Sequence, residues 1–176
     1  IYVGRIVKEK GVDLFVEAIK EIYTDFKEWN FKIIGTPRLG INKLDKFSRK
    51  IKYDFESLGD RAEMLGFINS EDLNHIMSET SIIVIPSRWN EPFGLVAAEA
   101  MSNGIAIVSS NSGGLPEIIS NNGILIDQIN SKKISKNLKQ ILSNTSMLKE
   151  LQKKSWENFN FNSKKISSIL DDHRKE

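Results

Sequence analysis

Residues 81–104 read SIIVIPSRWNEPFGLVAAEAMSNG, and this stretch decides the fold class. Its beginning, 81–86, is short, apolar and β-branched, which predicts a buried strand. The Pro-Phe-Gly turn at 92–94 predicts a helix that begins near Phe93 or Gly94, with Glu91 just before it and Glu99 in its second turn. A strand, a glycine turn and a helix start together place backbone N–H groups beside a carboxylate. This corner suits a ligand with both phosphate and hydroxyl groups, which points to a sugar nucleotide.

Strands and helices are expected to alternate along most of the chain. Helix-period apolar residues run from Val12 to Phe26, from Leu44 to Leu58, and through a shorter segment around Leu73 with Ser70 as its expected N-cap. After Asp127 the pattern is helical only, and about 150–176 is expected to form a helical tail. We therefore predict a single α/β domain over 1–176, Rossmann-like with three layers and a parallel sheet of about six strands. The predicted strands are 1–3, 31–34, 62–65, 82–85, 105–109 and 123–126.

The composition is that of a soluble globular protein. Of 176 residues, 40% are hydrophobic and 27% charged, and no apolar run approaches the roughly 20 residues that cross a bilayer. The net charge of +2 is too small to argue for nucleic acid as a partner. The absence of cysteine excludes disulfides and thiolate catalysis and fits a cytoplasmic location. Because the chain starts with Ile1 inside a predicted strand, we expect it to be a piece of a longer protein.

The loop after the first predicted strand reads Gly-Arg-Ile-Val-Lys-Glu-Lys-Gly and spans 4–11. Arg5 and Lys10 could be aimed at one anion, because Arg offers a planar fork and Lys a mobile point charge. The alternative is an ordinary solvated basic loop. The spacing matches neither a Walker A loop nor the G-x-G-x-x-G fingerprint, which disfavours P-loop and NAD enzymes.

Two carboxylates and a polar turn complete the candidate site. Glu91 and Glu99 are expected to accept hydrogen bonds from ligand hydroxyls, because carboxylates beside a phosphate would repel it. The alternatives are a surface helix residue for Glu99 and, for Glu91, a residue at the helix N-terminus that favours the dipole, with Pro92 as a first helical residue. The turn at 109–117 either brings backbone amides to a ligand or is an ordinary strand-to-helix turn. His75 and His173 show no metal-ligand spacing.

Four motifs in sequence order resemble the retaining GT-B glycosyltransferases of the large family four. They are Gly-Arg-x4-Lys-Gly at 4–11, Pro-Ser-x3-Glu-Pro-Phe-Gly-Leu at 86–95, the Glu-x7-Glu pair, and Gly-Gly-Leu-Pro-Glu at 113–117. The resemblance covers roughly 1–130. It implies the C-terminal, donor-binding half of a GT-B fold, with the N-terminal acceptor domain missing from the chain and transfer impossible without it.

The resemblance also implies an activity and its partners. The donor would be a nucleoside-diphosphate sugar such as a UDP-sugar, and a hexosyl group would pass with retention to a glycan or lipid-linked acceptor. No metal and no other cofactor is expected. The pathway implied is polysaccharide or lipopolysaccharide assembly in the cytoplasm, with the full-length protein peripherally associated with the inner membrane face.

Carried over residue by residue, the resemblance assigns roles to eleven positions. Arg5 and Lys10, beside Gly4, would hold the donor diphosphate and stabilise charge on the departing nucleoside diphosphate. Glu91 would bond hydroxyls of the transferred sugar near the reacting carbon without acting as a glycosidase-style nucleophile. Catalysis would thus depend on Glu91, Arg5 and Lys10. The other donor-binding roles are backbone N–H groups of Phe93, Gly94 and Leu95 for sugar hydroxyls and phosphate, Glu99 for the ribose, and Gly66, Phe67 and Ile68 for the base.

The sequence departs from the family pattern at two places, and two functions other than glycosyl transfer are alternatives for it. Many members have a glycine-rich turn where this chain has Gly-Thr-Pro-Arg at 35–38, and Pro37 lacks a backbone donor. The tail at 151–176 matches only loosely, through Trp156 and Phe159, and is expected to fray or to contact a second copy. The alternatives are a GT-B-fold sugar-nucleotide epimerase, which the Glu-Pro-Phe-Gly context disfavours, and a non-catalytic nucleotide-binding module.

Overall fold

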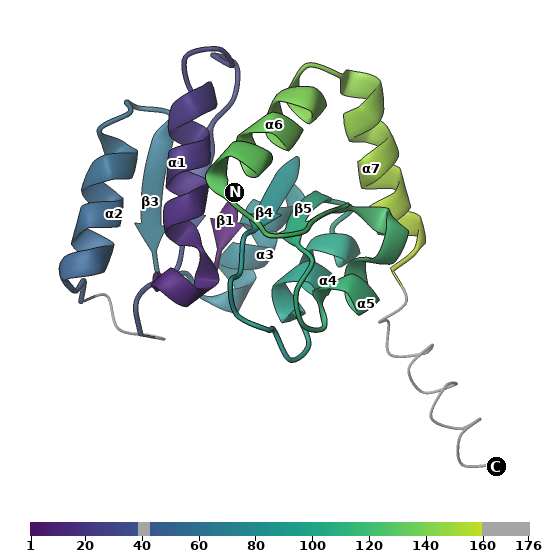
Figure 1. Cartoon of the computed structure of the whole chain (residues 1–176), viewed down its shortest axis with the longest axis horizontal. Coiled ribbons are helices and arrows are strands. Elements are labelled where there is room, and N and C mark those ends of the chain that lie inside the picture. The colour runs from purple at the N-terminus through teal and green to yellow at the C-terminus, as the bar shows by residue number, and fades with distance from the viewer. Residues whose placement is uncertain (39–42, 160–176) are drawn as a thin grey trace.

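The computed structural model describes residues 1–38 and 43–159, and within them six strands alternate with helices (Figure 1). The predicted strands at 31–34 and 82–85 are confirmed at both ends, and the other four differ by one residue at one or both ends. The strands are β1 Tyr2–Val3, β2 Phe31–Ile34, β3 Ala62–Gly66, β4 Ile82–Ile85, β5 Ala106–Ser110 and β6 Ile124–Ile126. The α-helices are α1 Val12–Ile22, α2 Lys46–Glu56, α3 Ser70–Ser78, α4 Leu95–Ser102, α5 Leu115–Ile119, α6 Ser131–Leu142 and α7 Thr145–Glu157, with 3₁₀ turns η1 Lys8–Lys10 and η2 Ser120–Asn122.

The strands form two parallel ladders that meet at the start of the chain. One ladder has the order β1-β2-β3 and the other β4-β5-β6. Between them, the Val84 N–H donates to the Ile1 carbonyl at 2.9 Å and the Ile1 nitrogen to the Ile82 carbonyl at 2.7 Å. The spatial order is therefore β3-β2-β1-β4-β5-β6. The strands are added on one side of β1 up to β3 and on the other side from β4 onward, so the strand order reverses between β1 and β4. In open α/β sheets this is the place where ligands bind, at the carboxyl ends of the strands.

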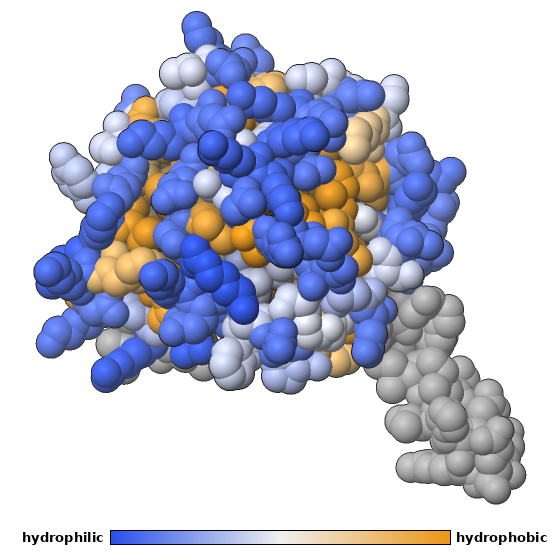
Figure 2. All heavy atoms as spheres, viewed as in Figure 1, coloured by the Kyte–Doolittle hydropathy of each residue, from blue (hydrophilic) through white to orange (hydrophobic). Residues whose placement is uncertain are grey.

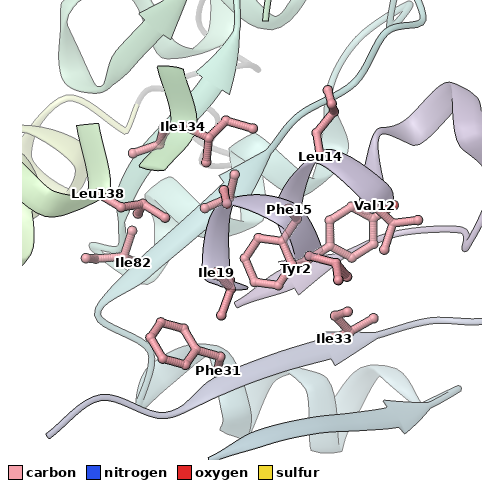
Figure 3. Close-up of a cluster of buried hydrophobic side chains, with 14 of the residues drawn as sticks. Tyr2, Val12, Leu14, Phe15, Ile19, Phe31, Ile33, Ile82, Ile134 and Leu138 are labelled. Carbon is pink, nitrogen blue, oxygen red and sulfur yellow. The ribbon is translucent and has the colours of Figure 1, made fainter. Parts of the chain in front are cut away.

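Helices cover both faces, as the predicted three-layer α/β/α architecture requires. Alternate residues of β4 belong to different cores: Ile82 and Val84 pack with α1 and α6, whereas Ile83 and Ile85 pack with α4 and α5. Figure 1 shows α1 and α6 side by side over one face, and Figure 3 shows Phe15 and Ile19 of α1 pointing at the β2 side chains beneath them. Burial on both faces explains why the strand is apolar at every position.

Two details of the helix starts correct the sequence-based predictions. The N-cap of α3 is Asn69, whose side chain accepts from the Asp72 N–H at 2.9 Å, and not Ser70. Neither Glu91 nor Pro92 is helical, because Gly94 adopts a left-handed conformation with φ of 94° and α4 begins only at Leu95. Glu99 does lie in the second turn of α4, as predicted.

The end of the chain confirms the expected helical pattern after Asp127 in α6 and α7. Residues 160–176, which include His173 and most of the tail expected to fray or to contact a second copy, lie outside the described residues. Over the described ranges, no helix is long and apolar enough to cross a membrane. The face shown in Figure 2 is mostly hydrophilic at its edges, with apolar side chains gathered nearer its middle.

Candidate functional site

Two loops meet where the carboxyl ends of β1 and β4 lie side by side. The first spans 4–11 and the second 86–94. Gly11 at the end of the first loop has φ of 71°, and a Cβ there would lie 1.9 Å from the Pro86 carbonyl oxygen. The backbone N–H groups of Arg88 and Trp89 both donate to the Glu9 carbonyl, at 2.8 and 3.2 Å. The loops are thus in direct backbone contact, which only glycine at position 11 permits.

An ion pair outside the pocket ties the second loop to α1. The Arg88 guanidinium donates to both carboxylate oxygens of Asp13, at 2.7 and 2.8 Å, and to the Lys8 carbonyl at 2.6 Å. The hydrogen bonds that Arg88 donates to Asp13 raise the pKa of Arg88. Bidentate pairing of this kind fixes orientation as well as distance. Sequence reasoning missed it, because nothing in the pattern links two residues 75 positions apart.

Lys10 and Glu91, both predicted site residues, are in contact. The Lys10 Nζ lies 2.5 Å from Glu91 Oε1 and 2.7 Å from Oε2, and the two side chains are 24% and 13% exposed. The hydroxyl of Ser87 donates to the same Oε1 at 2.8 Å. The site therefore places a cation and an ionised acceptor next to each other at the switch point of the sheet. The Pro-Ser motif contained Ser87, but its contact with Glu91 is visible only in the fold.

The polar turn predicted at 109–117 supports the Glu91 loop. The Gly114 N–H donates to the Glu91 carbonyl at 2.7 Å, and a Cβ on Gly113 would lie 2.4 Å from both the nitrogen and the carbonyl oxygen of Glu91. The Ser112 hydroxyl is 3.1 Å from the Trp89 carbonyl. The turn leads from β5 into α5, which begins at Leu115 with proline in its first turn.

A pocket of about 330 Å³ opens beside the Lys10–Glu91 pair. Its walls come from the end of β1, the end of β4, the second loop and the first turn of α4, which has no side-chain cap. Tyr2 also lines the pocket; its hydroxyl donates to the Arg5 carbonyl at 2.8 Å, and burial raises its pKa, so this group stays protonated. Six predicted site residues line the pocket: Gly4, Lys10, Glu91, Phe93, Gly94 and Leu95.

The other five predicted residues lie outside the lining of this pocket. Arg5 is exposed on the loop beside it. Glu99 is exposed one turn beyond Leu95, although partial burial of its carboxyl raises its pKa. Gly66 is the last residue of β3, which β2 separates from β1, and Phe67 and Ile68 follow it.

The turn after β2 forms backbone hydrogen bonds both with the end of β3 and with the first loop. The Gly66 carbonyl accepts from the Gly35 N–H at 2.7 Å, and the Thr36 carbonyl accepts from the Ile6 N–H at 3.1 Å. Pro37 is buried beside them. The turn at 35–38 thus connects the first loop to β3.

Metal-binding side chains do not gather in the part of the chain that the structure describes: no three His, Cys, Asp or Glu residues there are placed to hold a metal ion. His75 lies exposed on α3, with its Nε2 3.8 Å from a carboxylate oxygen of Glu79.

Known proteins share this fold and sequence pattern. MJ1178, an uncharacterized glycosyltransferase of Methanocaldococcus jannaschii, is 30% identical over 182 residues, covering 98% of this chain and 48% of the relative. The lipopolysaccharide 1,2-N-acetylglucosaminetransferase of Salmonella typhimurium is 26% identical and covers 90% of this chain and 45% of the relative. The chain thus spans about half the length of these relatives.

Among solved structures, Anabaena HepE in complex with UDP superposes with a TM-score of 0.80 at 20% identity, over 97% of this chain and 48% of that one. At this identity the likeness shows the fold alone, a Rossmann-like α/β/α domain of the kind that forms half of a GT-B fold. The family model for glycosyl transferases group 1 matches residues 1–158. The chain therefore belongs to the glycosyl transferases group 1 family.

Proposed function

We propose that this chain is the donor-binding domain of a retaining glycosyltransferase and that it binds a nucleoside-diphosphate sugar. The observation that carries the proposal is the contact between Lys10 and Glu91 in one pocket at the switch point of the sheet. A cation next to a hydroxyl-accepting carboxylate matches the two chemical parts of such a donor, a diphosphate and a sugar. HepE, which has the same fold, was solved with UDP, and this supports a uridine nucleotide as the first ligand to test.

The roles proposed for individual residues come from the family motifs, and the lining of the pocket supports those of Lys10 and Glu91. Lys10 and Arg5 bind the diphosphate and stabilise the charge that develops on the leaving nucleoside diphosphate, and no metal ion is required for this. Glu91 accepts hydrogen bonds from the sugar hydroxyls. As an acceptor already bonded to Lys10 and Ser87, it is suited to orienting the sugar and not to attacking it. Backbone N–H groups of the uncapped first turn of α4 favour the negatively charged part of the ligand.

Two further parts of the donor site lie at its edges. Glu99 binds the ribose hydroxyls from the second turn of α4, and Gly66 at the end of β3, with Phe67 and Ile68 after it, borders the base. The acceptor, a glycan or a lipid-linked sugar, binds to an N-terminal domain of the full-length protein, which works in the cytoplasm or at the inner membrane face. The isolated chain would bind the donor but would not transfer the sugar.

The first test is a titration of this chain with UDP, GDP and ADP, followed by amide NMR shifts. We expect one nucleotide to bind preferentially and to shift amides near Phe93 to Glu99. Replacement of Lys10 or Arg5 by Ala removes a charge-assisted bond, so each variant should weaken binding about tenfold or more. Lys132→Ala is the matched control, because Lys132 is an exposed lysine of α6, away from the pocket.

The opposite result would be binding that is equal in the Lys10→Ala, Arg5→Ala and Lys132→Ala variants, which would remove the basis for the proposed site. Activity is then measured on the full-length protein with a nucleotide sugar. Release of nucleoside diphosphate together with sugar transfer identifies a glycosyltransferase. A changed sugar nucleotide without transfer identifies an epimerase, and binding without turnover identifies a non-catalytic module.

A further inference from the structure

We propose that Ser87 is a positioning residue that holds Glu91 for the sugar, and that it thereby sets the preference of the site for a nucleotide sugar over the free nucleotide. This inference rests on the proposed function, because it assigns a specificity-determining role within the same pocket.

The contacts of Ser87 direct its single hydroxyl proton to Glu91. The side chain is 2% exposed at the end of β4, and its Oγ lies 2.8 Å from Glu91 Oε1. The carbonyl oxygens of Trp89 and Glu9 are farther away, at 3.2 and 3.5 Å. A carboxylate is also the stronger acceptor, because the hydrogen bond is charge-assisted. The Trp89 N–H donates to Oγ at 3.2 Å, which holds the hydroxyl oxygen in place for this bond.

Among the described residues, the Glu91 carboxylate has two side-chain partners, Lys10 and Ser87, and a donor would compete for only one of them. Lys10 binds both carboxylate oxygens, at 2.5 and 2.7 Å. Donor phosphates attract the same ammonium group, so binding of the diphosphate weakens the hold of Lys10 on Glu91. Ser87 is neutral and buried at a strand end, so the phosphates do not draw it away. It keeps Oε1 in position and leaves Oε2 as an acceptor for a sugar hydroxyl.

Because the diphosphate competes for Lys10 but not for Ser87, a binding experiment can distinguish the roles of the two residues. Loss of Lys10 removes charge that the diphosphate needs, so both free nucleotide and nucleotide sugar bind less well. Loss of the Ser87 hydroxyl leaves the phosphate contacts intact but lets the Glu91 carboxylate rotate. Only the ligand that contains the sugar is then affected, and the effect requires that Glu91 be present as a carboxylate.

The experiment measures dissociation constants for three ligand pairs, UDP with UDP-glucose, GDP with GDP-mannose, and ADP with ADP-glucose, and uses the pair that wild type binds. Ser87→Ala should weaken binding of the nucleotide sugar about fivefold, the equivalent of one net hydrogen bond, while the free nucleotide changes less than twofold. Ser87→Thr, which restores a hydroxyl, should recover most of the sugar preference. In a Glu91→Ala background, which removes the acceptor, Ser87→Ala should have no further effect on the preference.

Ser135→Ala supplies a matched control elsewhere in the fold. Ser135 is fully buried on α6, and its hydroxyl donates to the carboxylate of Glu21 on α1 at the same 2.8 Å. This variant loses a serine–carboxylate bond of the same kind and should leave the sugar preference unchanged. Thermal unfolding of both serine variants shows whether their stabilities are comparable.

Two results would overturn the positioning role while leaving the proposed function in place. One is an equal loss of affinity for both members of a pair in Ser87→Ala, which indicates general disruption of the loop. The other is an effect of Ser87→Ala that persists in full in the Glu91→Ala background. Failure of the proposed function is recognised separately, because no nucleotide would then bind in a manner that depends on Lys10, and the inference about Ser87 would fall with it.

Discussion

At the scale of single residues, the site depends on contacts in which one backbone segment lies directly against another. Gly113 has φ of 58° and lies under the nitrogen and carbonyl oxygen of Glu91, with no room for a side chain. Gly104 has a similar φ of 65°, but a Cβ there would meet its nearest neighbour, the Trp156 Cβ, only at 3.4 Å. The two glycines therefore share the same backbone conformation and differ in the space around them.

This pair allows backbone strain and steric collision to be separated. Gly104→Ala should cost about 1–2 kcal/mol of unfolding free energy, because a non-glycine residue is strained in the left-handed region. Gly113→Ala adds a collision with the Glu91 backbone and should cost at least about 1 kcal/mol more. Urea unfolding measures both values. Equal losses for the two variants would mean that the Glu91 loop moves aside freely and that Gly113 does not determine its position.

The sequence predicted single residues well where they belong to motifs whose family resemblance implies one shared ligand. Lys10 and Glu91 were predicted to act on one ligand, and the structure places them in contact. The Asp13–Arg88 pair was not predicted, because each residue alone is an ordinary surface charge. Their contact arises from the adjacency of β1 and β4, which no local pattern contains.

At the scale of elements, the start of α3 shows that the sequence does not identify the N-cap where two favoured capping residues follow one another. Asn69 and Ser70 are both favoured N-caps, and the sequence-based choice of Ser70 was wrong by one position. The Asn69 side chain accepts from the Asp72 N–H, whereas Ser70 is the first helical residue. By contrast, the bounds of β4 were predicted correctly because both of its faces are buried and every residue is apolar.

Substitution of these neighbours provides a direct comparison. Asn69→Ala should lower the unfolding free energy by about 1 kcal/mol, because an N–H at the helix start loses its acceptor. Ser70→Ala should change stability by less than about 0.5 kcal/mol, because alanine is a good helix former. Chemical denaturation of the two variants in parallel gives the difference. A larger loss for Ser70→Ala would instead identify Ser70 as the functional cap.

At the scale of the whole molecule, one hydrophobic core joins the two ladders of the sheet. The cluster that contains Phe31 and Ile33 of the first ladder also contains Ile82 and Val84 of the second, and Phe15 of α1 belongs to it as well. Figure 3 shows members of both ladders around α1. The predicted α/β architecture followed from the alternation of strands and helices. The division into two ladders did not, because it depends on how short β1 is.

A shared core predicts that the two ladders unfold together. Trp29, which packs against the first core, and Trp156 on α7 can each be kept as the sole tryptophan by replacing the other two with Phe. Their fluorescence should report the same urea midpoint, which should agree with the midpoint from circular dichroism. Midpoints that differ beyond error between the two reporters would show that the boundary between β1 and β4 separates two cooperative units.

The pairing of Lys10 with Glu91 bears on which anions can occupy the pocket in a crowded cell. An unpaired lysine in a cleft attracts every small phosphate and sulfate. Here any such ion competes with a carboxylate on the same molecule, whose effective concentration next to Lys10 is far above that of a solute. A ligand with one anionic group gains one contact and must break another. A ligand that offers phosphate to the lysine and hydroxyls to the carboxylate compensates both partners at once, so the resting ion pair acts as a filter against the commonest competitors.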